Sequence, residues 1–352
     1  MTISIKEIVS VGQERGASDI HLCCGVPPKG RVDGKLTNLF EEPLTHEDCE
    51  NLGREMAGAK YAKMEEIGEL DLALTINDSR CRINLFREQG HCSCALRILH
   101  DGIPPLDKLG LPPVIHQIPN WQKGIVLVTG ETGSGKSTTM ASLLNEINKT
   151  RYEHIITLED PIEYIYKPDK SLISQREVGK DTVSYAEGLR AILREDPDII
   201  LIGEMRDAIT IETALTAAET GHLVFATLHT NSAVDSVDRI VGTFPADRHN
   251  QIRMQLSTTL NAVLSQQLLV RKSGKGRILA CEIMIVTPAL RNQIREGKTP
   301  QMQSSLLAGA KDGSVTMDNY ILDLYRRNEI SLSTAIEAAN DQEYIKQRIG
   351  GR

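Results

Sequence analysis

The 352-residue sequence is poor in aromatic residues, with one Trp and four Phe, so its core must rely on Ile, Leu, Val and Met. It has no run of about 18 apolar residues and therefore predicts no transmembrane helix. Segment 1–20 mixes charged and apolar residues and lacks the apolar centre of a signal peptide. From these absences we expect a cytoplasmic protein.

A disulfide framework is also missing, because the seven cysteines have no regular spacing. Cys92-Ser-Cys94 beside His91 raises the alternative of a zinc site, but a single C-x-C without a second pair favours buried core cysteines. The formal net charge of −7 argues against electrostatic attraction of the whole protein to nucleic acid or anionic lipid. We therefore expect neither nucleic acid nor a structural metal as a partner.

The first part of the chain, 1–99, is predicted to be a small α+β domain. Residues 3–14 have apolar positions at helical spacing, and segments 69–76, 81–86 and 92–99 alternate like strands of an antiparallel meander. Segment 100–106 contains Gly and Pro, which interrupt regular secondary structure, and it is the predicted linker.

The second part, 107–352, has a different pattern. Continuous apolar runs at 125–128, 155–158, 199–202 and 223–227 alternate with helical segments. Runs of this kind indicate strands buried on both faces, hence an α/β fold with a parallel sheet between helices. From about residue 288 the sequence predicts helices only.

One motif carries chemistry directly. The stretch from Gly130 to Ser137, GETGSGKS, fits G-x-x-x-x-G-K-[ST] between a strand and a helix, as a P-loop requires. Its glycines let backbone N–H groups surround phosphate oxygens, Lys136 reaches the β- and γ-phosphates, and the Ser137 hydroxyl ligates Mg²⁺. The residues expected around the nucleotide are Gly130, Glu131, Thr132, Gly133, Ser134, Gly135, Lys136, Ser137 and Thr138.

Carboxylates follow two of the predicted strands. Glu204 comes one residue after the strand end, where Gly203 replaces the usual Asp, and it is suited to polarise an attacking water. Glu159 and Glu163 follow the run at 155–158, and such a cluster is costly unless it faces a cation or the attacking water. No guanine-type N-K-x-D signature is present, so ATP is favoured over GTP.

Two histidines flank the predicted strand 223–227. We expect His222 and His229 to lie beside the same sheet edge and, with Glu219, to sense the γ-phosphate. The alternative is that each is an ordinary structural histidine.

These elements in this order resemble the secretion and pilus ATPase superfamily. The matching stretches are the Walker A loop at 130–138, TLEDPIEY at 157–164, LREDPDIILIGEMRD at 193–207 and AAETGHLVFATLHT at 217–230. Segment 289–296, ALRNQIRE, further resembles the C-terminal motif of the PilT family, the retraction ATPases of type IV pili. The tetracysteine loop usual in extension ATPases is missing.

The resemblance implies a PAS-like N-terminal domain, a RecA-like ATPase domain and a homohexameric ring. It implies a motor that hydrolyses ATP with Mg²⁺ to retract pili for twitching motility, peripheral to the inner face of the cytoplasmic membrane. There it would act on an inner-membrane platform protein of the pilus machinery. It also assigns Arg82 and Arg97 to the phosphates, with Arg194 and Arg206 as competitors. Which of them act across subunits stays open.

Three other functions compete with this interpretation. An extension-type or type II secretion assembly ATPase would carry the same motifs. A RecA-like nucleic-acid motor is disfavoured by the acidic balance, and a non-hydrolysing regulator by the intact Lys136, Ser137 and Glu204.

Overall fold

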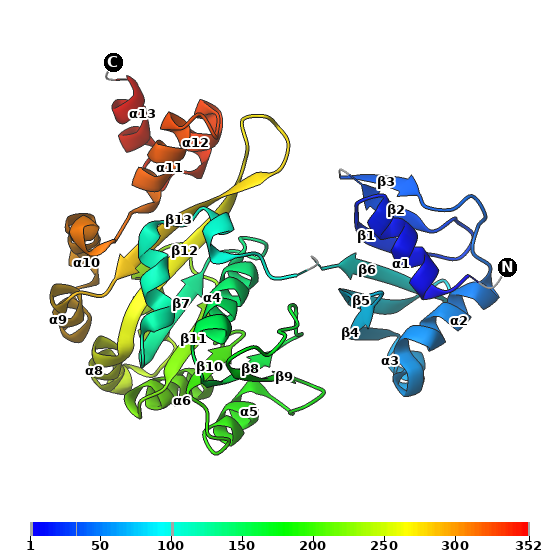
Figure 1. Ribbon diagram of the computed structural model, residues 1–352, viewed down its shortest axis with the longest axis horizontal. Helices are drawn as coiled ribbons and strands as arrows, with labels where there is room; N and C mark the ends of the chain where they lie inside the picture. The colour runs from blue at the N-terminus through cyan, green and yellow to red at the C-terminus, as the bar shows by residue number, and fades with distance from the viewer. Residues whose placement is uncertain (1–2, 33, 100–101, 351–352) are drawn as a thin grey trace. The chain divides into compact units, whose positions relative to one another are not determined.

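A computed structural model describes residues 3–32, 34–99 and 102–350 (Figure 1). The chain forms two compact units, Met1–Ile103 together with Pro161–Ile165, and Pro104–Asp160 together with Tyr166–Arg352. His100 and Asp101, where the predicted linker begins, lie outside the described residues.

The first unit is an antiparallel sheet packed against helices, as predicted. Its described strands have the order β3-β2-β1-β6-β5-β4. They are β1 (Ala17–Leu22), β2 (Lys29–Val32), β3 (Lys35–Asn38), β4 (Glu69–Ile76), β5 (Ser79–Glu88) and β6 (His91–Ile98). The helices are α1 (Ile5–Glu14), α2 (His46–Ala57) and α3 (Tyr61–Ile67).

Local chemistry explains where these helices begin. Ser4 caps α1 by accepting from the Glu7 N–H, and Thr45 and Asp48 form a reciprocal capping box on α2. Burial of Ile8 and Val9 then fixes the α1 face that meets the core. The core holds Cys49, Cys92 and Cys94 among aliphatic side chains, as expected for core cysteines.

The second unit contains the predicted parallel sheet, with the order β13-β12-β7-β11-β10-β8-β9 in its described part. Its strands are β7 (Gly124–Thr129), β8 (His154–Glu159), β9 (Leu172–Glu177), β10 (Ile199–Ile202), β11 (Leu223–Leu228), β12 (Leu260–Val270) and β13 (Arg277–Ile285). Every residue of β7, β10 and β11 is buried, which is why their sequences are continuously apolar. Only β13 runs antiparallel to its neighbour.

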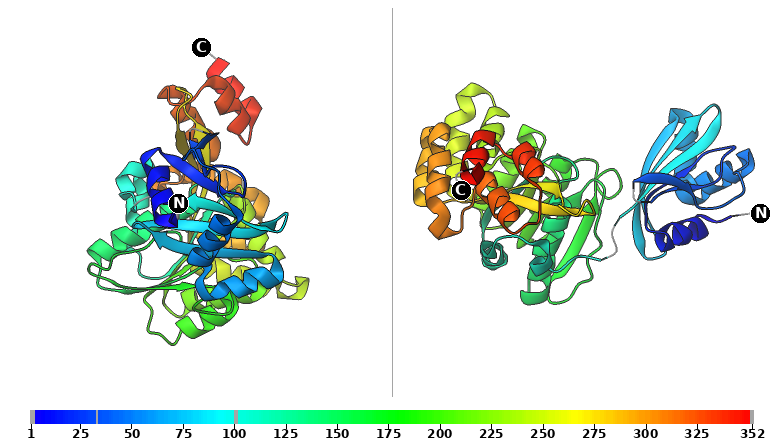
Figure 2. Two further views of the ribbon diagram at one scale, coloured as in Figure 1. Left: turned by 90° about the vertical axis from the view of Figure 1, so that its right-hand side faces the viewer. Right: turned by 90° about the horizontal axis from the view of Figure 1, so that it is seen from above.

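Helices connect and follow these strands. They are α4 (Lys136–Thr150), α5 (Tyr185–Ile192), α6 (Ala208–Glu219), α7 (Ala233–Gly242), α8 (His249–Thr259), α9 (Pro288–Glu296), α10 (Thr299–Ala308), α11 (Met317–Arg326), α12 (Leu332–Ala338) and α13 (Gln342–Gly350). Short 3-10 helices occupy Gly58–Lys60, Leu106–Leu109, Pro113–Asn120, Ala246–Arg248 and Gly309–Asp312. Described strands end at Ile285, so the prediction of a helical C-terminal segment is confirmed. The views in Figure 1 and Figure 2 show α11, α12 and α13 grouped beside the β12–β13 hairpin.

Candidate active site

The P-loop connects the buried end of β7 to the first turn of α4. Its glycines at 130, 133 and 135 have φ values of 137°, 82° and 95°, which favour glycine. A Cβ on Gly130 would also lie 2.3 Å from the backbone oxygen of Gln266, so only glycine fits there.

Several groups of this loop suit a phosphate. The Lys136 ammonium donates to the carbonyls of Gly130 (2.7 Å) and Glu131 (2.9 Å), so its charge lies over the loop. The Ser134 hydroxyl is buried and has no hydrogen-bond partner within the described chain. A buried hydroxyl normally finds a partner, and a phosphate oxygen at a helix N-terminus would supply one.

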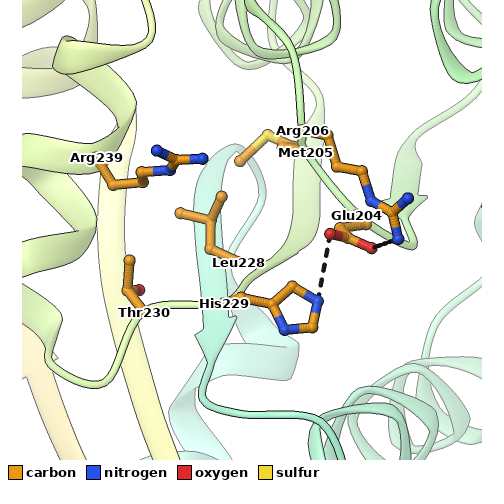
Figure 3. A pocket seen from close by; sticks show the side chains of 7 residues that line it. All are labelled: Glu204, Met205, Arg206, Leu228, His229, Thr230 and Arg239. Atoms are coloured by element: carbon orange, nitrogen blue, oxygen red, sulfur yellow. Dashed lines mark ion pairs between the residues drawn. The ribbon is translucent and has the colours of Figure 1, made fainter.

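Glu204 follows β10, and each of its carboxylate oxygens contacts a nitrogen of a different side chain (Figure 3). Arg206 contacts one oxygen at 2.6 Å, and the Nε2 atom of His229 contacts the other at 3.2 Å. Partial burial alone would raise the pKa of the Glu204 carboxyl, but these two neighbours outweigh it and hold the pKa below its usual value. Glu204 is therefore a carboxylate at neutral pH.

A cavity of about 530 Å³ opens beside this carboxylate (Figure 3). It is lined by Glu204, Met205, Arg206, Leu228, His229, Thr230 and Arg239. Arg239, from α7, faces this cavity but lies outside the motifs used to choose site residues, so sequence analysis missed it. The cavity leaves room for a reactant next to the Glu204 oxygens.

The end of β8 lies next to the end of β10, because Leu158 pairs with Ile202. Glu159 there accepts hydrogen bonds from the Thr157 hydroxyl (2.6 Å) and the Gln175 amide (3.2 Å). Two carboxylates, Glu159 and Glu204, thus come from neighbouring strand ends. Glu163 belongs to Pro161–Ile165, the stretch that is part of the first unit.

The backbone at Gly203 lies close to Tyr185 and to β8. A Cβ at position 203 would lie 2.9 Å from the Tyr185 hydroxyl and 3.1 Å from the Leu158 oxygen. Burial raises the pKa of Tyr185, and Asp160, Glu204 and Glu159 raise it further. Sequence analysis missed this tyrosine because nothing local marks it as a neighbour of two strand ends.

The expectation that His222 and His229 flank one sheet edge is wrong. His222 precedes β11 and His229 follows it, so the six-residue strand places them at opposite edges, ~20 Å apart at ~3.3 Å per residue. Only His229 is at the P-loop edge. The Nδ1 atom of His222 contacts the Ala217 carbonyl at 2.8 Å, so this imidazole closes the end of α6. Glu219 ends the same helix and accepts from Gln255.

Arg82 and Arg97 lie directly opposite each other on β5 and β6 of the first unit. Like charges in such a cross-strand pair repel, so an anion bound between them would lower the free energy of the pair. Asp19 offsets part of the charge, since it pairs with Arg97 at 2.8 Å. Of their competitors, Arg206 is bound to Glu204, and Arg194 is exposed just after α5.

The described residues contain neither a candidate metal site nor a helix suited to span a membrane. No three His, Cys, Asp or Glu side chains in the described ranges are close enough to share a metal ion. None of the described helices combines the length and apolar character needed to cross a bilayer.

A phosphate loop at the edge of a buried parallel sheet, with a carboxylate at the end of another strand at the same edge, defines a P-loop nucleotide-binding protein. The family described as type II/IV secretion system protein matches residues 86–317, and the chain belongs to this family.

Individual relatives are similar over almost their full length. The type IV pilus retraction ATPase PilT of Pseudomonas aeruginosa is 44% identical over 97% of this chain and 99% of its own. The twitching motility protein of Neisseria gonorrhoeae is 42% identical over 90% of this chain and 85% of its own. The crystal structure of the pilus retraction motor PilT with bound ADP superimposes with a TM-score of 0.92 at 46% identity, covering 98% and 99% of the two chains. The resemblance to the PilT family and the fold class are therefore confirmed.

Proposed function

We propose that this chain is a motor ATPase that retracts type IV pili and so supports twitching motility. The observation that carries the proposal is a complete P-loop after β7 together with the paired carboxylate Glu204 after β10, in a chain similar to PilT over 97% of its length. The loop serves nucleotide binding, and Glu204 serves hydrolysis.

ATP fits the loop through charge and geometry. The backbone N–H groups of 130–135 and the N-terminus of α4 would surround the phosphates, with Lys136 adding a full positive charge. The Ser137 hydroxyl and the Glu159 carboxylate are the oxygen donors available to Mg²⁺, which would offset phosphate charge when bound. Thr138 follows Ser137 in the first turn of the same helix.

Glu204 has the protonation state that a general base needs. A carboxylate offers about four lone-pair sites, so Arg206 and His229 leave it able to accept a proton from water. His229, reached from β11, links Glu204 to the next strand end, where it can respond to the γ-phosphate. His222 precedes β11 and therefore lies away from the P-loop edge. We propose a structural role for it at the end of α6.

The proposed motor is a homohexamer in the cytoplasm, held at the inner face of the membrane by the pilus platform protein. Its Arg82–Arg97 pair would neutralise phosphate charge during hydrolysis, as arginine fingers do. Movement of the unit that carries these arginines would then follow the nucleotide cycle. The family resemblance supports this arrangement.

The test is to delete the gene in its host and to count surface pili by electron microscopy. Complementation with wild type, Lys136→Ala and Glu204→Gln assigns the phenotype to the site. Excess pili without twitching, rescued only by wild type, is the expected result. Bald cells would show that the chain drives pilus extension instead, and unchanged pili would contradict both.

A further inference from the structure

Three buried polar residues form a row across the sheet of the second unit. Thr129 on β7 pairs with Ser265 on β12, and Ser265 pairs with Glu282 on β13. Their exposed fractions are 0%, 0% and 1%. Directly paired residues on neighbouring strands share a face, so this polar row interrupts an otherwise apolar layer.

Each member of the row has a partner for its polar atoms. The hydroxyls of Thr129 and Ser265 lie 2.8 Å apart. One oxygen of Glu282 accepts from the backbone N–H of Ala233 at 2.8 Å, and the other accepts from Met317 at 3.4 Å. A buried carboxylate is costly unless it is hydrogen-bonded, so these two N–H groups are what hold Glu282 in the core.

The two donors are the first residues of two different helices. Ala233 begins α7 and Met317 begins α11. Helix N-termini carry partial positive charge, so both favour a carboxylate between them. Glu282 thereby joins two helices whose starting residues are 84 positions apart in the chain.

One of these helices, α7, begins close to the edge of the sheet where the P-loop and Glu204 lie, which we call the nucleotide edge. The short loop 229–232 connects β11 to α7 and carries His229, the partner of Glu204. Within it, the Thr230 hydroxyl contacts that of Ser236 at 2.7 Å, and Glu282 anchors its far end at Ala233. At the other end of the row, Thr129 immediately precedes the P-loop.

The second helix leads to the C-terminal segment. Helix α11 packs against β13, α12 and α13. We propose that Glu282 is a positioning residue, which fixes the His229 loop to the first turn of α11 and transmits the state of the nucleotide edge to the C-terminal helices. This inference rests on the proposed ATPase function, because it assigns a nucleotide to that edge.

The first test needs no substitution. Hydrogen exchange of the wild-type chain is followed by mass spectrometry with and without ADP, on peptides covering 229–236 and 316–322. We expect ADP to change exchange in both peptides together. A change at 229–236 without one at 316–322 would overturn the proposal, and so would a change in neither peptide at an ADP concentration shown to saturate the protein.

The second test uses Glu282→Gln, whose amide has nearly the same shape but can accept from only one of the two N–H groups. We expect kcat to fall roughly tenfold while KM changes less than about threefold, because the lost contact affects the reacting geometry more than binding. The ADP effect on 316–322 should disappear.

The matched control is Asp323→Asn, also in α11 but outside the 316–322 peptide. Asp323 pairs with Arg327 at 2.5 Å, and no hydrogen bond joins it to Glu282 in the described part of the chain. It should leave kcat and the ADP effect unchanged. Equal loss in both variants, or unchanged kcat in a folded Glu282→Gln chain, would contradict the assignment. If wild type binds ADP but does not hydrolyse ATP, the proposed function fails while the exchange result still decides the role of Glu282.

Discussion

At the scale of single residues, Glu204 is defined by its contacts with Arg206 and His229. Replacing it with Gln removes the proton acceptor but keeps the shape and the contact with Arg206. We expect kcat for ATP hydrolysis to fall by at least ~10², since general-base catalysis contributes about that much. Nucleotide affinity should stay within a few-fold of wild type.

Steady-state hydrolysis and equilibrium binding of a fluorescent ATP analogue measure the two quantities. Glu187→Gln is the control, because Glu187 is exposed on α5 and pairs only with Arg190 among the described ion pairs. Near-normal turnover in Glu204→Gln would assign the base to another residue, of which Glu159 on the adjacent strand end is the next candidate.

Glu282 makes a pH-dependent contribution to stability. Burial raises the pKa of its carboxyl above the usual 4.5, and Asp318 and Asp235 add to the effect, although the two N–H groups oppose it. The folded state therefore favours the protonated form of Glu282 more than the unfolded state does. The stabilisation that protonated Glu282 gives to the folded state is fully present below about pH 4.5. It is lost as the pH rises through the pKa of Glu282 in the folded state.

The free energy of unfolding of wild type, minus that of Glu282→Gln, should thus decrease as the pH rises above 4.5 and through the folded pKa. Urea unfolding across this range measures it, and Glu187→Gln should show no comparable trend. A difference that grows with pH would mean that the carboxylate is stabilised as an ion by its two helices.

At the scale of elements, α9 serves the packing of its own unit. Leu290 and Ile294 are buried in the core. Arg291 closes the C-terminal end of α8, since its guanidinium donates to the carbonyls of Ser257 (2.9 Å) and Thr258 (3.0 Å) and to the Asn261 side chain (3.0 Å). The PilT-like motif is therefore built into the fold of this unit.

Arg291→Ala should lower the free energy of unfolding by roughly 1–2 kcal/mol, because one exposed and two partly buried hydrogen bonds lose a charged donor. Arg291→Lys should recover only part of this loss, since an ammonium cannot match the planar fork. Thermal or urea unfolding measures both variants. Arg295→Ala, on the exposed side of α9, is the control and should change little. Equal stability of all three would contradict the capping role.

The parallel strands and the P-loop were predictable because their signals are local. Strands β7, β10 and β11 are buried on both faces and therefore read as apolar runs, and the loop is one contiguous motif. The β12–β13 hairpin was missed, since its strands mix apolar residues with Gln266, Gln267 and Glu282.

Contacts between distant parts of the chain left no such signal. The placement of His222 failed because residues before and after a strand lie at opposite edges, however close they are in sequence. Tyr185, Arg239 and Glu282 are single polar residues whose neighbours in space lie on other elements. Their roles depend on strand register and on which strand ends are neighbours in the sheet. A local sequence pattern predicts neither of these two properties.

At the scale of the whole molecule, the proposed ring raises the question of whether Arg82 and Arg97 act on the nucleotide of their own chain or of a neighbouring subunit. A closed ring is built from head-to-tail contacts between neighbours, so a residue donated across each contact makes hydrolysis depend on assembly. The repulsion between the two opposed arginines, which Asp19 offsets in part, would then be relieved further when phosphate charge is near.

Mixing two inactive chains distinguishes these two assignments. The double variant Arg82→Ala with Arg97→Ala keeps its own Glu204, and Glu204→Gln keeps its arginines. If arginines act across subunits, an equal mixture forms rings in which about a quarter of the sites combine intact Glu204 with intact neighbouring arginines, so ATP hydrolysis returns. Each chain alone, assembled to the same size by gel filtration, should stay inactive. No recovery in mixed rings would place the arginines on the nucleotide of their own chain, because then every site lacks one of the two groups.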